Sequence, residues 1–250
     1  MKVSIVTACF NSATTIADCI LSVNNQTYVN IEHIIIDGGS NDKTLDIINS
    51  IPNRVKKIVS ERDSGIYDAM NKGLSLTTGD LVAILNSDDL YYDINVIKNI
   101  VNTFLANENT QIVYGDLIYV KKHDTSDVVR LWKSRTYYNQ FFENGNVPPH
   151  PSLFLRSAVY QSAGLFDVRF KLAADYEFMF RILKKFDFPS VYYPGILVKM
   201  RYGGATNKNI KNIIYQNKEI LKAWKVNGFK SPKAFLLVKM YKRLIQFIKK

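Results

Sequence analysis

The chain has 250 residues, 47% hydrophobic and 22% charged, and this composition excludes a disordered or low-complexity protein. Its formal net charge of +11 comes from one segment, because residues 208–250 contain twelve basic side chains and one acidic side chain. Residues 1–207 carry 21 basic and 21 acidic side chains and are neutral. The charge therefore does not mark the main body of the chain as a nucleic-acid-binding domain.

The sequence also gives expectations about redox state and location. The only two cysteines, Cys9 and Cys19, are expected to be a reduced, buried pair. Residues 1–6 enter a strand pattern without the charged and apolar lead of a signal peptide, and no apolar run reaches eighteen residues. We therefore expect a cytoplasmic protein whose only membrane contact is peripheral, at the inner face of the cell membrane.

Strand and helix patterns alternate over the first ninety residues. Apolar or β-branched runs predict strands, and apolar residues at every third or fourth position predict helices. The predicted strands are residues 3–8, 33–37, 57–60 and 81–85, and the predicted helices are residues 12–24, 42–50 and 66–76. This alternation predicts an α/β fold with a mostly parallel, doubly wound sheet flanked by helices.

Three of these predicted strands end in acidic residues. Asp37 ends the second strand, Asp63 follows the third, and Asp88 and Asp89 follow the fourth. Ligands of such sheets bind beyond the carboxyl ends of the strands. The acidic ends therefore predict one binding site on one rim of the sheet.

Beyond residue 95 the pattern is less regular. Predicted helices lie at 95–107, 156–163 and 175–185, and predicted strands at 112–114, 118–120 and 190–193. The last forty residues or so are predicted to be helical, with a break near 227–232 where Gly and Pro occur.

The pair Asp88-Asp89 indicates a metal site, because two adjacent carboxylates repel each other unless a cation neutralises them. A hard divalent cation, Mn²⁺ or Mg²⁺, suits one or two carboxylates together with diphosphate oxygens, and it stabilises a departing nucleoside diphosphate. A solvated turn or a helix N-cap is the alternative for this pair.

Four motifs follow one another along the chain: residues 3–11 (VSIVTACFN), 37–42 (DGGSND), 60–73 (SERDSGIYDAMNKG) and 85–89 (LNSDD). Together they resemble the inverting family 2 glycosyltransferases with the GT-A fold, over about residues 3–206. The third motif is similar to the branch that builds exopolysaccharides, O-antigens and colanic acid. The resemblance implies a GT-A domain over 1–207, with a donor half of about 1–115 and an acceptor half of about 116–207. Residues 208–250 would be a basic helical extension.

The resemblance assigns the donor site residue by residue. It implies that Thr7, Asn11, Asp37, Asp63 and Lys72 bind the donor. For Asp37 the alternative is an Asx-turn, and for Asp63 a surface position beside Arg62.

The resemblance also separates the roles of the acidic pair. It implies that Asp88 contacts the ribose and that Asp89 binds the metal. Asn86 departs from the family pattern, since many relatives have a third acid there, and this leaves the choice of metal open.

Residues 172–177 (LAADYE) resemble the segment that carries the catalytic base of the family. Ala174 replaces a glutamate, whereas Asp175 keeps the catalytic position, where one carboxylate takes the proton of the attacking hydroxyl. A helix N-cap is the alternative for Asp175. Glu177 is the second candidate for the base.

Two further segments are assigned from the same resemblance. His150, in the proline-rich loop 147–152, would face the acceptor, although a lone histidine is also compatible with a structural role. Arg201 precedes Gly203-Gly204 in a loop that would close over the donor, with Arg201 paired to a phosphate.

Residues 233–250 predict an amphipathic helix with basic and apolar faces. Such a helix fits an anionic membrane surface, and docking on the domain or on the partner subunit of a homodimer is the alternative. Lys239, Lys242 and Arg243 lie on the basic face, and Leu237, Met240 and Tyr241 lie on the apolar face.

The resulting hypothesis is a metal-dependent inverting glycosyltransferase of cell-surface polysaccharide synthesis, with a nucleotide-sugar donor, a UDP-sugar first among them. The acceptor would be a saccharide or a lipid-linked saccharide. A nucleotidyltransferase is the main alternative, and a nucleic-acid-binding protein using the basic tail is the next, although no reader motif accompanies the charge. An oxidoreductase is disfavoured because no Gly-x-Gly-x-x-Gly follows the first strand.

Overall fold

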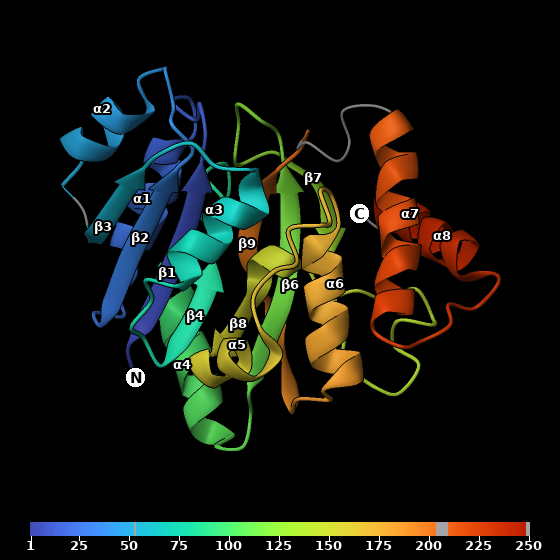
Figure 1. The fold of residues 1–250 in the computed structure, drawn as a ribbon. Helices are drawn as coiled ribbons and strands as arrows, with labels where there is room; N and C mark the ends of the chain where they lie inside the picture. Colours follow the sequence, from blue (N-terminus) through green and yellow to red (C-terminus); the bar gives the residue numbers. More distant parts are fainter. Residues whose placement is uncertain (53, 204–209, 249–250) are drawn as a thin grey trace.

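A computed structural model describes residues 1–52, 54–203 and 210–248, which form one twisted β-sheet with helices on both faces (Figure 1). The described strands follow the order β3-β2-β1-β4-β8-β6-β9-β5, and β7 pairs with β6. Six of these nine strands run in one direction, since only β5, β7 and β8 are antiparallel to their neighbours. The predicted α/β fold with a mostly parallel sheet is confirmed.

The amino-terminal half has the predicted alternation of strands and helices. Its elements are β1 (Val3–Cys9), α1 (Ile16–Asn24), β2 (Ile31–Asp37), α2 (Thr44–Ser50), β3 (Val55–Ser60), α3 (Ile66–Leu74), β4 (Leu81–Ile84), β5 (Leu90–Tyr91) and α4 (Val96–Ala106). Every residue of β1 and β2 is buried, as expected for parallel strands covered on both faces. Cys9 and Cys19 are free and buried in this half, as predicted.

Helix α3 lies unusually close to the sheet because it carries Gly73. A Cβ atom on Gly73 would lie 2.3 Å from Val6 Cγ1 and 3.2 Å from Ile36 Cγ1, so a larger residue would push α3 away from β1 and β2. This close packing fixes the position of the helix that begins directly after Asp63 and Gly65.

The carboxyl-terminal half extends the same sheet. Its elements are β6 (Ile112–Val120), β7 (Val128–Trp132), a 3₁₀ turn η1 (His150–Ser152), β8 (Leu153–Arg156), α5 (Ser157–Ala163), α6 (Ala174–Phe180), a π-helical turn η2 (Arg181–Lys185), β9 (Ser190–Arg201), α7 (Ile210–Val226) and α8 (Phe235–Ile248). The strands predicted at 112–114 and 118–120 are one strand, which continues through a register shift at Gly115 and Asp116. Strands β5, β7 and β8 were not predicted.

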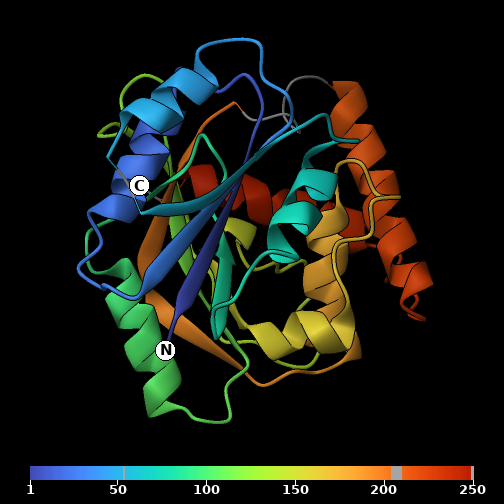
Figure 2. The ribbon, with the colours of Figure 1, turned by 60° about the vertical axis from the view of Figure 1, so that its left-hand side comes forward.

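The two C-terminal helices pack into the core of the domain. Trp224 of α7 is buried, with its ring 4.6 Å from that of Phe180 in α6 and 5.2 Å from that of Phe235 in α8. The Glu219 carboxylate of α7 accepts hydrogen bonds from two backbone amides, of Lys171 and Leu172, just before α6. Figure 1 and Figure 2 show α7 beside α6, at the opposite end of the sheet from α2.

Candidate active site

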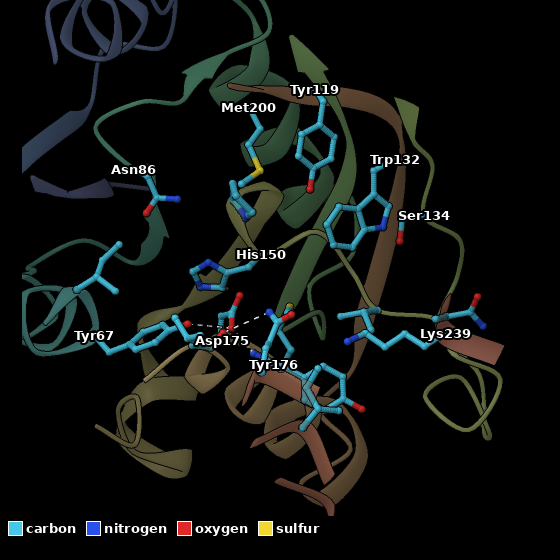
Figure 3. A pocket seen from close by; sticks show the side chains of 18 of the residues that line it. Tyr67, Asn86, Tyr119, Trp132, Ser134, His150, Asp175, Tyr176, Met200 and Lys239 are labelled. Atoms are coloured by element: carbon cyan, nitrogen blue, oxygen red, sulfur yellow. Dashed lines mark hydrogen bonds between the residues drawn. The ribbon is translucent and has the colours of Figure 1, made fainter. Parts of the chain in front are cut away.

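A cavity of about 440 Å³ opens beyond the carboxyl end of β4, between the sheet and helices α6 and α8. Asp88 is one of the residues that line it. Figure 3 shows Asn86 on one side of the cavity, with Asp175 and His150 nearer its middle. The position agrees with the rule that ligands of parallel α/β sheets bind beyond the carboxyl ends of the strands.

Asp175 lies in this cavity, in the first turn of α6. Its Oδ1 accepts hydrogen bonds from the Tyr67 hydroxyl at 3.0 Å and from the Tyr176 backbone amide at 2.8 Å, whereas Oδ2 receives none from the described residues (Figure 3). Burial, and then the charge of Asp175, raises the pKa of Tyr67 well above its usual value, so its hydroxyl remains a donor. The N-cap of α6 is Ala173, and so Asp175 is a cavity-lining carboxylate and not the helix cap.

His150 lies in the same cavity, next to Asp175. The stiff loop around Pro149 and Pro151 places it in η1, where its ring meets Phe166 edge-on at 5.5 Å. Burial lowers the pKa of His150, against the opposing effect of the Asp175 charge, so the imidazole is neutral at neutral pH. A neutral ring can donate or accept one hydrogen bond beside the carboxylate.

The acidic pair lies at the donor side of the cavity, with unequal exposure. Asp88 lines the cavity, whereas Asp89 is fully buried and accepts a hydrogen bond from the Asn86 side-chain amide at 3.0 Å. Burial, and then the neighbouring Asp88, raises the pKa of Asp89 well above its usual value. Oδ1 of Asp89 and Oδ1 of Asn86 are both buried without a hydrogen-bond partner. These unsatisfied oxygens are ligands of the kind that Mg²⁺ and Mn²⁺ prefer.

A cation bound to Asp88 and Asp89 would need further coordinating oxygens from a bound diphosphate. In the ranges that the structure describes, no three His, Cys, Asp or Glu side chains converge to hold a metal ion. A divalent cation held by one or two carboxylates completes its shell with diphosphate oxygens and water. The donor set therefore fits a metal that binds together with a diphosphate.

The other predicted acids meet on the same rim, as expected. A Cβ atom on Gly38 would lie 2.5 Å from Asp63 Oδ2, so the turn after Asp37 touches Asp63 directly. Asp37 itself is buried, and accepts hydrogen bonds from the Ser60 hydroxyl at 2.6 Å and the Ser40 amide at 3.0 Å. Burial alone would raise the pKa of Asp37, but these hydrogen bonds outweigh it and the pKa is lowered. The contacts of Asp37 are therefore those of an Asx-turn, which was the alternative to direct donor binding.

Asn11 and Phe10 lie at the end of β1 beside this turn. Asn11 has a positive φ of 49°, and its side-chain oxygen accepts a hydrogen bond from the Asn41 amide at 3.0 Å. The Phe10 ring is 60% exposed and faces Gly38. Sequence reasoning missed Phe10, although an aromatic residue directly after a buried strand was a usable signal.

Thr7 and Lys72, both predicted to bind the donor, have other partners. The Thr7 side chain is buried, and its hydroxyl lies 2.9 Å from Nε2 of His33. Lys72 forms an ion pair with Glu61 at 2.8 Å and donates to the Arg62 carbonyl. Neither side chain lines the cavity.

Arg201 and Glu177 are likewise bound to protein groups, and neither side chain lines the cavity. Arg201 is buried, pairs with Asp18, and donates to the Asp88 carbonyl at 2.8 Å, so it braces the acidic turn rather than facing a phosphate. Glu177 is buried in a two-pronged ion pair with Arg181, at 3.0 Å for each bond, and does not line the cavity. Gly204, the second glycine of the expected lid, lies outside the described residues.

Basic and aromatic side chains form the far wall of the cavity, and sequence reasoning missed most of them. Tyr119 and Trp132 stack with ring planes 5° apart, and the Arg130 guanidinium lies 4.1 Å from the Tyr119 ring centre. In Figure 3, Trp132 and Lys239 lie across the cavity from Asn86, with Asp175 between them. The basic residues on the wall are Arg130, Lys133, Arg135, Lys171, Lys239 and Lys242.

Comparisons with known proteins agree with this fold and place the chain in a family. The model of the family described as glycosyl transferase family 2 matches residues 4–162. The chain is 30% identical over 181 residues to the PGL/p-HBAD biosynthesis glycosyltransferase of Mycobacterium bovis. The matched region covers 71% of this chain and 68% of that protein. It is 31% identical over 214 residues to an uncharacterized glycosyltransferase of Rickettsia typhi, covering 83% and 66% of the two chains.

Solved structures share the fold at low sequence identity. TarS of S. aureus superposes with a TM-score of 0.67 at 14% identity, over 98% of this chain and 72% of that chain. A mannosyltransferase of Pyrobaculum calidifontis, solved with GDP-Man and Mn²⁺, also gives 0.67, at 17% identity over 98% and 70%. These similarities confirm the GT-A fold.

The family model and the curated relatives identify the protein as a glycosyltransferase. The chain belongs to glycosyl transferase family 2, as the sequence motifs indicated. This membership supports the glycosyltransferase over the nucleotidyltransferase and the nucleic-acid-binding protein that the sequence left as alternatives.

Proposed function

We propose that the protein transfers a sugar from a nucleotide-sugar, a UDP-sugar first among them, to a saccharide or lipid-linked saccharide, with inversion and with a divalent metal. The acceptor product would belong to a cell-surface polysaccharide. The observation that carries this proposal is the position of Asp175, which faces the cavity with Oδ1 held by Tyr67 and Oδ2 available. Structures of TarS with UDP-GlcNAc and of the mannosyltransferase with GDP-Man support a nucleotide-sugar donor.

The proposed reaction is a single displacement. The acceptor hydroxyl oxygen attacks the anomeric carbon, the bond from that carbon to the diphosphate oxygen breaks, and the hydroxyl proton moves to Oδ2 of Asp175. Tyr67 holds the carboxylate in place through Oδ1, and the neutral ring of His150 orients the incoming hydroxyl. Attack opposite to the departing diphosphate inverts the anomeric configuration.

The donor would extend along the rim of strand ends. Its base fits the exposed face of Phe10 beside Gly38 and Asp63, and its ribose fits the Asp88 side of the cavity. Asp88 and Asp89 would hold the metal, which neutralises the charge of the departing diphosphate. Asp37 and Asn11 would shape this pocket through the turns they brace.

Product analysis with an Asp175 variant tests this proposal. We expect release of nucleoside diphosphate, not pyrophosphate, and a glycoside of the opposite anomeric configuration by NMR. Asp175→Asn should keep donor binding but lower kcat by about 10²- to 10⁴-fold, because it removes the proton acceptor. Glu177→Gln is the matched control, as its carboxylate faces Arg181 instead. Near-normal turnover by Asp175→Asn would show that the base is elsewhere.

A donor screen tests the nucleotide and the metal separately. We expect one class of nucleotide-sugar to raise the melting temperature in the presence of Mn²⁺ or Mg²⁺, since specific binding stabilises the folded state. Asp89→Ala should lose the metal-dependent part of this rise. If no nucleotide-sugar stabilises the protein, a nucleotide-sugar donor is excluded.

We also propose that α8 rests on an anionic membrane surface. Leu237, Met240 and Tyr241 are all more than half exposed on one side of this helix. In the described part of the chain, no helix is long and apolar enough to cross a membrane. Replacing all three by Ser should reduce sedimentation with phosphatidylglycerol-containing vesicles, whereas Ser at Ile214 and Tyr215 of α7 should not. Unchanged vesicle binding, or loss of a dimer on gel filtration instead, would assign this surface to a second copy of the chain.

A further inference from the structure

Three of the six basic residues of the cavity wall lie outside residues 4–162, which the family model matches, and none of the six lies in the four sequence motifs. Lys239 and Lys242 lie three residues apart on α8 and therefore share one face of that helix, and both of these partly exposed side chains line the cavity. Gly145 makes this packing possible, since a Cβ atom on it would lie 3.0 Å from the Lys239 backbone nitrogen. The basic face predicted for a membrane is thus partly a wall of the active site.

The two lysine cations are held by asparagine side chains, whereas the Arg135 side chain is exposed at the edge of the cavity. The Lys242 ammonium donates to the Asn146 side chain at 2.6 Å, and the backbone carbonyl of Arg135 is fixed by the Tyr114 hydroxyl at 2.8 Å. Burial, and then the positive charge of Arg135, lowers the pKa of Lys242, as two cations near one another require. Confined like charges of this kind favour an anion between them.

The acids near the cavity do not neutralise this wall. The six basic residues of the wall outnumber the two acidic residues that line the cavity, Asp88 and Asp175, which belong to the catalytic side. Asp116 is the acid behind Lys133, and its carboxylate accepts from the Ser134 amide at 2.7 Å and from the Tyr192 hydroxyl at 2.9 Å. The wall therefore keeps an excess of positive charge.

We propose that the acceptor carries a phosphoryl group, which binds between Arg135 and Lys242, with Lys239 beside it, while its sugar hydroxyl points to Asp175. The proposal rests on the proposed function. In Figure 3 the donor-side residue Asn86 and the α8 residue Lys239 lie on opposite sides of Asp175, so this anion site is separate from that of the donor diphosphate. The stacked rings of Tyr119 and Trp132 on the same wall suit the flat face of a sugar.

Calorimetric titration of the full chain with inorganic pyrophosphate in EDTA tests this site without metal or donor. We expect binding that weakens with salt, and a loss of about tenfold in affinity for Lys242→Gln and for Arg135→Gln, as for a removed charge-assisted hydrogen bond. Lys242→Arg should restore it. Lys233→Gln is the matched control, because Lys233 is exposed just before α8 and does not line the cavity.

The donor-site variant Asp89→Ala distinguishes the two sites. Pyrophosphate should bind this variant as it binds the wild type, whatever the donor screen shows. Wild-type affinity in both Lys242→Gln and Arg135→Gln, or no binding of pyrophosphate at all, would overturn the proposal. Glucose 1-phosphate and dodecyl phosphate identify the source: tighter binding of dodecyl phosphate assigns the group to a lipid-linked acceptor, and equal binding assigns it to a water-soluble sugar phosphate.

Discussion

In the donor half, most side chains that the motifs single out are held by neighbouring protein groups, whereas several charged side chains of the acceptor half and of α8 line the cavity. Asp37 is bound by its own turn, Thr7 by His33, and Lys72 by Glu61. Asp175 and Lys242, by contrast, both face open space. In the proposed mechanism the donor half thus provides the rim, and the chemistry and the choice of acceptor depend on segments that come later in the chain.

The prediction with the largest expected effect tests whether α7 is part of the folded core of the acceptor half. Trp224→Ala should lower the free energy of unfolding by about 3–5 kcal/mol, because it empties a buried site against Phe180 and removes the hydrogen bond to the Tyr176 hydroxyl at 2.9 Å. Urea unfolding measures this, with Tyr215→Ala as the control, since Tyr215 is 48% exposed on the same helix. A loss below about 1 kcal/mol would make α7 an independent appendage.

The next effect tests whether Asp37 is structural. Asp37→Asn should cost about 2 kcal/mol of unfolding free energy at neutral pH, because it weakens several hydrogen bonds to a buried carboxylate. The folded pKa of Asp37 is lowered, so its stabilisation is present above the unfolded pKa of about 3.9 and is lost as the pH falls through the folded value.

The pH dependence of unfolding separates Asp37 from other acids. The Asn variant should show a flatter decline in stability below about pH 4 than the wild type does. Asp46→Asn, an exposed acid in α2, should leave the decline unchanged. If Asp37→Asn kept full stability but lost donor binding, the carboxylate would bind the nucleotide directly.

A smaller effect tests the support of the proposed base. Tyr67→Phe should lower kcat by about tenfold and leave donor binding unchanged, because it removes the hydrogen bond that holds Oδ1 of Asp175. Tyr160→Phe is the control, since Tyr160 stacks on Phe178 at 5.1 Å outside the cavity. A rise in the donor KM with unchanged kcat would place Tyr67 in the donor site instead.

The smallest effect concerns Thr7. Thr7→Val should leave the donor Kd unchanged and cost about 1 kcal/mol of stability, because His33 loses its hydroxyl partner in the core. Thr14→Val, at an exposed position, serves as the control for the substitution itself. A tenfold rise in the donor Kd would return Thr7 to the nucleotide pocket and weaken the contrast between the two halves.

The sequence predicted the donor half well because its signals are local. Each strand is a short apolar run, and each acid follows directly after one, so the rim of Asp37, Asp63 and Asp88 needed only the rule for parallel sheets. The direction of single side chains could not be predicted in the same way. Both faces of β1 are buried, so no alternation in the sequence shows whether Thr7 points to the ligand or to His33.

The acceptor half depends on contacts between distant residues. Tyr67 and Asp175 are 108 positions apart, and Lys242 and Asn146 are 96 positions apart. Periodicity predicted correctly that Lys239 and Lys242 share a face of a helix, but it contains no information on what that face packs against. The short strands β5 and β8 form only because β9, β4 and β6 offer them edges, which local propensity does not show.

The clamp of Glu219 on the backbone before α6 has a consequence for the order in which the enzyme becomes active. Domains fold from the amino terminus as they are synthesised, and the donor rim is complete before α7 has been made. Helix α6, with Asp175, is held by Glu219 and Trp224 only after those residues have emerged. A nascent chain would therefore acquire its nucleotide-sugar pocket first and its means of transfer last.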